Sequence, residues 1–144
     1  MYQRDYILRM IEMLSELIAG ILGLIKRGNF TQASEKLNRI YYDMLKQDAI
    51  FFKSIPKDKL TNTLLQDHNF TGGHIEILAE LFDTEAELEM AQGNLPDSLE
   101  YSGKSLMLFE FIDREQKTYS QERINKINEI KKRIERLRQN NNLT

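Results

Sequence analysis

Two histidines and several carboxylates are the residues of this chain whose types could support chemistry. His68 and His74 flank a loop at residues 69–73, and Glu76 and Glu80 follow within two helical turns. Imidazole and carboxylate groups are common ligands of transition metals. The His-Glu-x-x-His spacing of a helical zinc site is absent, however. A small metal- or ligand-binding enzyme centred on His68, His74 and the Glu76/Glu80 face is therefore an alternative function and not the preferred one.

Four carboxylates recur at helical spacing and would line one face of a helix. They are Glu76, Glu80, Asp83 and Glu87. Like charges at this spacing destabilise an isolated helix by about 0.2–0.5 kcal/mol per pair, so something must compensate. Solvent, the basic C-terminal segment or a cationic partner would each do so. We take these four residues as a hypothetical partner-binding surface, with a solvated or ion-paired face as the open alternative.

Several kinds of chemistry are excluded by what the sequence lacks. It has no Cys, which rules out disulfides, a thiol nucleophile and Cys-ligated zinc. It contains no phosphate-binding Gly-x-x-x-x-Gly-Lys-Ser/Thr run and no Gly-x-Ser-x-Gly nucleophile pattern. We therefore predict no catalytic residue, no metal site and no cofactor.

The formal net charge of −2 conceals three regions of different sign. Residues 1–59 carry a net charge of +3, residues 60–103 a net charge of −9 without any Lys or Arg, and residues 104–144 a net charge of +4. Such an asymmetry bears on partners and electric fields and not on the fold.

The basic residues near the C-terminus raise the question of nucleic-acid binding. They fall on a predicted helix in which Glu122 with Lys126, and Glu129 with Arg133, form favourably oriented i,i+4 pairs. Such pairs are typical of an exposed helix that covers a bundle. Because the whole chain is acidic and has no recognised nucleic-acid-binding motif, nucleic acid is not the partner we favour.

The spacing of the apolar residues predicts an all-α fold. With only 7 Gly and 2 Pro, the chain lacks the many tight turns of a β-sandwich or barrel. Apolar residues recur every three or four positions, as in helices with one buried face. We expect about five to six helices packed as antiparallel hairpins. The second helix should bury Ala33, Leu37, Ile40, Tyr41, Met44 and Leu45.

The chain is predicted to form one helical domain over residues 1–139, followed by a disordered tail at 140–144. The helix that contains Leu106 to Ile112 should be the most buried, because this run is apolar except for Glu110. The predicted parts of the domain are an N-terminal hairpin at 2–47, an irregular linker with a short helix at 49–73, a second hairpin at 74–113 and a C-terminal helix at 119–138.

Two helix-ending corners have similar sequences. Gly28-Asn29 is followed by Phe30, and Gly93-Asn94 by Leu95, with a small residue three positions after each apolar one. A Gly-Asn pair suits a left-handed helix C-terminus. The two corners resemble the turn of the tetratricopeptide repeat, and their separation is close to two repeat periods. The resemblance implies a tetratricopeptide-like right-handed bundle and implies no particular ligand.

A second resemblance concerns the chain as a whole. The segment from Gln3 to Glu12 and the helical hairpin near the C-terminus are similar to those of a group of short bacterial helical proteins of unassigned function. This resemblance supplies no catalytic residue.

The first helix carries two features that bear on location and partners. Its most apolar run, residues 17–25, is far shorter than the roughly 20 residues that span a bilayer, so we expect a cytoplasmic protein without a membrane partner. Ala19, Gly20 and Gly23 form a patch of small residues where another helix could approach closely. Self-association through this patch, as a homodimer, is a hypothesis.

Together these patterns predict a non-catalytic protein-protein interaction or scaffold module. Its partner would be a peptide or a helix of another protein, of unknown identity. This expectation rests on the absence of any catalytic pattern and on the surfaces that paired helices leave exposed.

Overall fold

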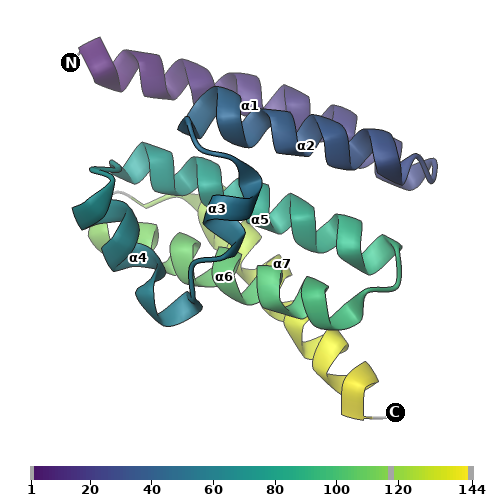
Figure 1. Ribbon diagram of the computed structural model, residues 1–144. Helices are drawn as coiled ribbons and strands as arrows, with labels where there is room; N and C mark the ends of the chain where they lie inside the picture. The colour runs from purple at the N-terminus through teal and green to yellow at the C-terminus, as the bar shows by residue number, and fades with distance from the viewer. Residues whose placement is uncertain (1, 117–118, 143–144) are drawn as a thin grey trace.

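The computed structural model describes residues 2–116 and 119–142, which are helical without any strand (Figure 1). The all-α fold is thus confirmed. The described residues contain seven α-helices, more than predicted, because the segment 49–73 holds two short ones. The elements are α1 (Tyr2–Lys26), α2 (Phe30–Leu45), α3 (Ala49–Lys53), a 3-10 turn η1 (Lys57–Lys59), α4 (Leu60–Asn62), a π-helical turn η2 (Thr63–Asp67), α5 (Gly72–Ala91), α6 (Leu95–Glu115) and α7 (Gln121–Asn142).

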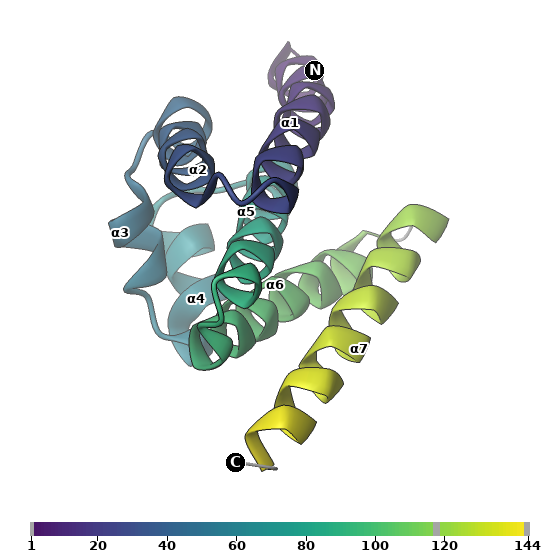
Figure 2. The same ribbon diagram turned by 90° about the vertical axis from the view of Figure 1, so that its right-hand side faces the viewer.

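Helix α5 lies at the centre of the molecule. It packs against α1, α2 and α6, while α7 packs against α6. Helices α1 and α5 run in the same direction, α2 and α6 run back against them, and α7 crosses them obliquely (Figures 1 and 2). Seen from the side, α7 stands apart from α1, with α5 and α6 lying between them (Figure 2). No helix in the described part of the chain is long and apolar enough to cross a bilayer.

The two Gly-Asn corners have nearly the same geometry. Gly28 has φ +80° and Gly93 has φ +84°, both in the left-handed region that favours glycine. At each corner the Asn N–H donates to the carbonyl five residues earlier, at 2.8 Å for Asn29 and 2.9 Å for Asn94. The predicted left-handed helix ends are confirmed. Each corner joins two long helices into an antiparallel hairpin.

Small buried residues let the helices of each hairpin pack closely. Ala33 is fully buried near the start of α2. In the second hairpin, buried serines occupy the interface, where the hydroxyl of Ser98 donates to the carbonyl of Ala86 at 2.7 Å. Ser105 donates to the carbonyl of Ala79 at the same distance. Because backbone carbonyls accept both hydroxyls, serine is as suitable as alanine at this interface.

The most buried helix is α5, and the prediction that the following helix would be is wrong. Helix α5 is enclosed on several sides, so apolar residues occur around most of its circumference. Helix α6 instead turns its serines toward α5 and keeps Leu106 half-exposed. In α2, all six predicted core residues are buried. The fully or almost fully buried apolar residues of α5 are Ile75, Ile77, Leu78, Ala79, Leu81, Phe82, Ala86 and Leu88.

Two helix boundaries differ from the predictions. Helix α5 begins at Gly72, two residues before the predicted start, because the Thr71 hydroxyl caps it by accepting from the N–H of His74. Helix α7 runs to Asn142, so residues 140–142 are helical where a tail was predicted. The rest of that predicted tail, 143–144, lies outside the described residues.

Candidate functional site

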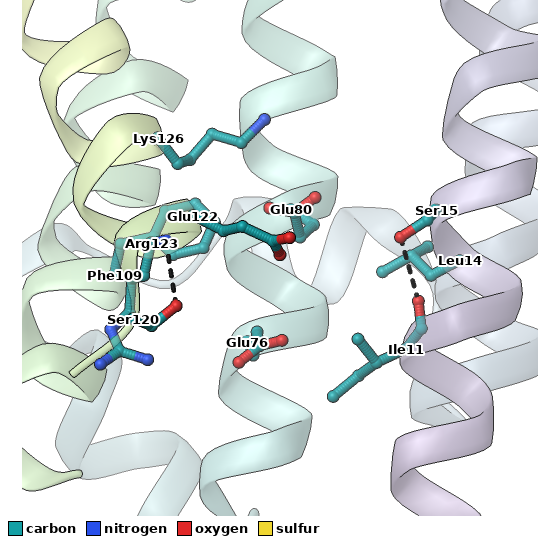
Figure 3. Close-up of a pocket in the computed structure, with 10 residues that line it drawn as sticks. All are labelled: Ile11, Leu14, Ser15, Glu76, Glu80, Phe109, Ser120, Glu122, Arg123 and Lys126. Atoms are coloured by element: carbon teal, nitrogen blue, oxygen red, sulfur yellow. Dashed lines mark hydrogen bonds between the residues drawn. The ribbon is translucent and has the colours of Figure 1, made fainter. Parts of the chain in front are cut away.

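A groove runs along α5 between α1 and α7. It consists of two cavities, of about 220 Å³ and 440 Å³, that share Lys126 in their walls. The first is lined by Ile11, Leu14, Ser15, Glu76, Glu80, Phe109, Ser120, Glu122, Arg123 and Lys126 (Figure 3). The second is lined by Ile18, Leu22, Asp83, Thr84, Glu87, Lys126, Glu129, Lys132, Arg133 and Arg136.

The four carboxylates that the sequence places on one helix face line the floor of this groove. Glu76 and Glu80 project from α5 into the first cavity, between α1 and α7 (Figure 3). Asp83 and Glu87 line the second cavity. The predicted partner-binding residues therefore share one groove.

Helix α7 compensates part of this acidic face. The buried guanidinium of Arg133 donates to a carboxylate oxygen of Asp83 and to one of Glu87, each at 2.6 Å. It also donates to the hydroxyl of Ser102 at 2.9 Å. The ammonium of Lys126 reaches the second oxygen of Asp83 at 3.2 Å. Asp83 and Glu87 are thus ion-paired within the chain, which was one of the open alternatives.

Glu76 and Glu80 are not neutralised in this way. Among the described residues, neither carboxylate forms a hydrogen bond or an ion pair. Burial raises the pKa of Glu80 to about 7, although the positive charge of Lys126 opposes the shift. Burial also raises the pKa of Glu76, against the opposing charge of Arg123. This end of the groove therefore holds two partly buried carboxyl groups that could accept hydrogen bonds from a cationic or hydroxyl group.

The wall formed by α1 is apolar. Ile11 and Ile18 line the two cavities, and Leu22 lies 40 % exposed at the far end. Leu8, one turn before Ile11, is 50 % exposed. Of the five large hydrophobic residues of α1 that are exposed in the described chain, Leu8 and Leu22 lie on this side of the helix, and Tyr6, Met13 and Leu17 lie on the other. Sequence reasoning missed this wall, although the excess of apolar residues over one helical stripe in α1 was a usable signal.

The small residues predicted for self-association lie at the surface of α1. Ala19 and Gly20 are exposed, and a methyl group added at Gly20 would meet no atom within 4 Å. At Gly23 such a group would meet only the guanidinium of Arg27, at 3.6 Å. No other helix of the described chain uses these positions for close packing. They are open to a partner, and whether one binds there stays a hypothesis.

The histidines are not brought together with the Glu76/Glu80 face. The Nδ1 of His74 accepts the N–H of Thr71 at 3.1 Å and so completes the cap of α5. Burial lowers the pKa of His74. His68 packs edge-on against Phe51, with ring centroids 4.9 Å apart. No group of three or more His, Asp or Glu in the described chain could hold a metal ion.

A second polar cluster lies on another side of α5, where no site was predicted. Glu85 is 2 % exposed and pairs with the ammonium of Lys53 at 3.1 Å. The ammonium of Lys104 donates to the carbonyl of Lys53 at 2.9 Å. Tyr41 belongs to the same cluster, and burial, together with the negative charge of Glu85, raises its pKa well above the usual value. These contacts tie α3 to α5 and α6. We assign the cluster a structural role, because a buried carboxylate needs a paired cation.

The basic residues of α7 divide into two groups. Arg123, Lys126 and Arg133 face the body of the protein, where their cations pair with carboxylates. Lys132 and Arg136 are exposed along the rim of the groove. A large share of the basic charge of α7 is therefore used inside the fold.

Comparison of the chain with family models, curated proteins and solved structures finds no match. The geometry of the groove is therefore the basis for a functional proposal.

Proposed function

We propose that this protein is a non-catalytic interaction module that binds an amphipathic helix of a partner in the groove between α1 and α7. The two Gly-Asn corners of equal geometry support a tetratricopeptide-like arrangement of its hairpins. In such arrangements paired helices present elongated grooves to other polypeptides. The proposal includes self-association, because a second copy can provide the bound helix.

One observation carries this proposal. The groove combines a partly exposed apolar wall on α1 with a charged floor on α5 and a cationic rim on α7. An amphipathic helix has the complementary pattern, since its apolar stripe can cover Ile11 and Leu22 while polar residues face α5 and α7. Covering large apolar side chains is the main source of free energy in such docking.

The shape of the groove agrees with a helix as the occupant. Its floor runs from Glu76 to Glu87, which corresponds to roughly 16 Å of helix at 1.5 Å per residue. A partner helix of three to four turns would fill it. Glu76 and Glu80, which have no hydrogen bond or ion pair within the described part of the chain, favour a Lys or Arg on that helix at the end of the groove near the start of α7.

The experiment is a selection from a display library of amphipathic helical peptides, with the full chain as bait. Selected peptides are then tested against two variants, Leu22→Asp and Leu17→Asp. The two leucines lie on α1 and are 40 % and 44 % exposed, but only Leu22 lines the groove. We expect Leu22→Asp to weaken binding at least tenfold, because a carboxylate would replace an apolar contact, and Leu17→Asp to change it less than twofold.

Two results would contradict the proposal. One is a selection that yields no helical binder. The other is binding that Leu17→Asp abolishes and Leu22→Asp leaves intact, which would move the interaction to the opposite side of α1. Circular dichroism of both variants verifies that each remains folded.

A further inference from the structure

One end of the groove carries carboxylates that the rest of the fold does not neutralise at close range. Glu76 and Glu80 of α5 line the first cavity, and Glu122 extends toward them from α7 (Figure 3). None of these three carboxylates forms a hydrogen bond or an ion pair with any described residue. This end, which we call the acidic end, can therefore receive a cation from outside the chain.

The cations in the walls of the acidic end pair with other carboxylates. The guanidinium of Arg123 donates to Asp113 of α6 at 3.0 Å, and the ammonium of Lys126 donates to Asp83 at 3.2 Å. They act on Glu76 and Glu80 only at longer range, and burial still raises the pKa of both carboxyl groups. An additional cation placed beside them would favour their charged forms.

The other end of the groove presents cations. Lys132 and Arg136 lie one turn apart on α7, line the second cavity and are exposed. Neither pairs with a carboxylate of the described chain. Glu129 also lines this cavity, but it lies about one turn nearer to the acidic end, where its charge acts on Lys126. The end at Lys132 and Arg136, which we call the cationic end, can therefore receive a carboxylate.

A single helix can reach both ends. Glu80 lines the first cavity and Glu87 the second, and these two residues of α5 are seven positions apart. Seven positions correspond to roughly 10 Å, or two turns of helix. Two side chains with this spacing lie on the same face of a bound helix, beside its apolar stripe. One such helix can therefore bring a cation to the acidic end and a carboxylate to the cationic end.

From this arrangement we infer that the occupant of the groove is a charge-polarised amphipathic helix of another protein. It carries a Lys or Arg over the acidic end and an Asp or Glu about two turns away, at the cationic end. The inference rests on the proposed function and specifies the partner of the same groove. A helix with basic residues at both positions, or acidic residues at both, would meet a like charge at one end. The charges thus provide specificity, while the apolar contacts with α1 supply most of the free energy.

Charge reversal on α7 tests the cationic end. Lys132→Glu is compared with Lys131→Glu, because Lys131 is also exposed but lines a different cavity and lies 3.7 Å from Glu110 of α6. The probe is a fluorescent helical peptide from the display selection, and its Kd is measured by fluorescence anisotropy. We expect Lys132→Glu to raise the Kd roughly three- to tenfold and Lys131→Glu to change it less than twofold.

A change in the peptide completes this test. Replacing the acidic residue that lies about seven positions from its basic residue by Lys should weaken binding to the unmodified chain. The same replacement should restore binding to Lys132→Glu, because the pair of opposite charges is formed again with the signs exchanged. The urea midpoint of each protein variant verifies that it remains folded.

Removal of one carboxylate tests the acidic end. Glu76→Gln should raise the Kd of the unmodified peptide roughly three- to tenfold, because the basic residue of the peptide loses a charged partner. Glu35→Gln, which removes an exposed carboxylate of α2, is the control and should leave the Kd unchanged. Raising the salt concentration should reduce the effect of Glu76→Gln and that of Lys132→Glu, because the charges of both ends are partly exposed.

The inference fails in ways that can be told apart from a failure of the proposed function. Selected peptides that are sensitive to Leu22→Asp but lack the basic and acidic pair would retain the function and remove the charge polarity. Equal effects of Lys132→Glu and Lys131→Glu would show that only the net charge of α7 matters, and tighter binding to Lys132→Glu would reverse the assigned polarity. A selection without helical binders would remove the function and this inference together.

Discussion

Glu80 and Asp83 lie one turn apart on the same face of α5, yet their surroundings differ. Asp83 is approached by both Arg133 and Lys126, so its negative charge is balanced at close range. Glu80 is partly buried without a hydrogen bond or ion pair among the described residues, and its pKa rises to about 7. The charged form of Glu80 is therefore disfavoured in the folded state. Glu76 and Glu85, whose pKa values are also raised mainly by burial, have the same tendency.

Glu80→Gln tests the consequence of this raised pKa for stability. Because the pKa is about 7 in the folded chain and about 4.5 when unfolded, the folded state binds more protons between these values. The stability contributed by the protonated group is fully present below pH 4.5 and is lost as the pH rises through 7. We therefore expect Glu80→Gln to be similar to the unmodified chain near pH 5 and more stable at pH 8.5, by on the order of 2–3 kcal/mol.

Urea unfolding at the two pH values measures this difference. Glu35→Gln, which changes an exposed carboxylate on α2, is the control and should have similar effects at both. Equal effects of Glu80→Gln at pH 5 and pH 8.5 would show that the Glu80 carboxylate is solvated.

Three glycines form a second residue-scale comparison. Gly28→Ala and Gly93→Ala place a Cβ at positive φ and should each lower the free energy of unfolding by about 1 kcal/mol. Gly20 lies in an open part of α1, so Gly20→Ala should raise it by about 0.5–1 kcal/mol through higher helix propensity. Thermal or urea unfolding of the three variants is the measurement. A loss of stability in Gly20→Ala would mean that another helix covers the surface at Gly20. This is the result expected if the chain self-associates through Gly20 and Gly23.

At the scale of the elements, α7 is held to the rest of the fold by two kinds of contact. Ile127, Ile130 and Ile134 are buried and belong to the common core. On the adjoining side, Arg133 connects α7 to two carboxylates of α5 and to a serine of α6. The apolar contacts supply most of the stabilising free energy. The ion pairs determine the register of α7 along the groove, because hydrogen-bonded charges require a specific geometry.

Arg133→Met separates these contributions. It removes the cation and leaves Asp83, which is 8 % exposed, with only Lys126 to balance it. We expect a loss of about 3 kcal/mol in the free energy of unfolding, since removing one partner of a buried pair leaves a charge uncompensated. Arg138→Ala, at an exposed position on the same helix, should change stability by less than about 0.5 kcal/mol.

The double variant Arg133→Met with Asp83→Asn provides a further control. It should recover part of the loss, because the uncompensated charge is then absent. A single-variant loss no larger than that of Arg138→Ala would show that solvent reaches Asp83 and that the pair contributes little.

The elements differ in how far the sequence predicts them. All six core positions of α2 followed from spacing alone, and both corners followed from Gly-Asn, because these features depend on neighbouring residues. The groove was not predictable in this way. It depends on α1 and α7 lying on either side of α5, and residues far apart in the sequence give no local signal of that arrangement. The same holds for the pair of Lys53 and Glu85, whose partners are 32 positions apart.

At the scale of the whole molecule, the uneven charge along the sequence becomes an arrangement in space. The strongly acidic middle of the chain includes α5, which lies at the centre, and the basic C-terminal region includes α7, which packs against α6 and reaches the carboxylates of α5 through Lys126 and Arg133 (Figures 1 and 2). Opposite charges thus face each other across the groove floor. Because α5 also contacts α1, α2 and α6, it cannot become exposed without the separation of most of the other helices.

Amide hydrogen exchange tests whether α5 organises the fold. The amides from Ile77 to Leu88 should exchange only when the whole chain unfolds, so their free energy of exchange should equal the free energy of unfolding measured with urea. The last turn of α7 lies at the edge and should exchange through local fraying, with a free energy several kcal/mol lower. Segment 49–67, made of short helices and turns, should fall between these limits. Exchange from α5 that is as fast as that from α7 would mean that α5 opens independently, and the groove floor would then not be the rigid surface that helix binding requires.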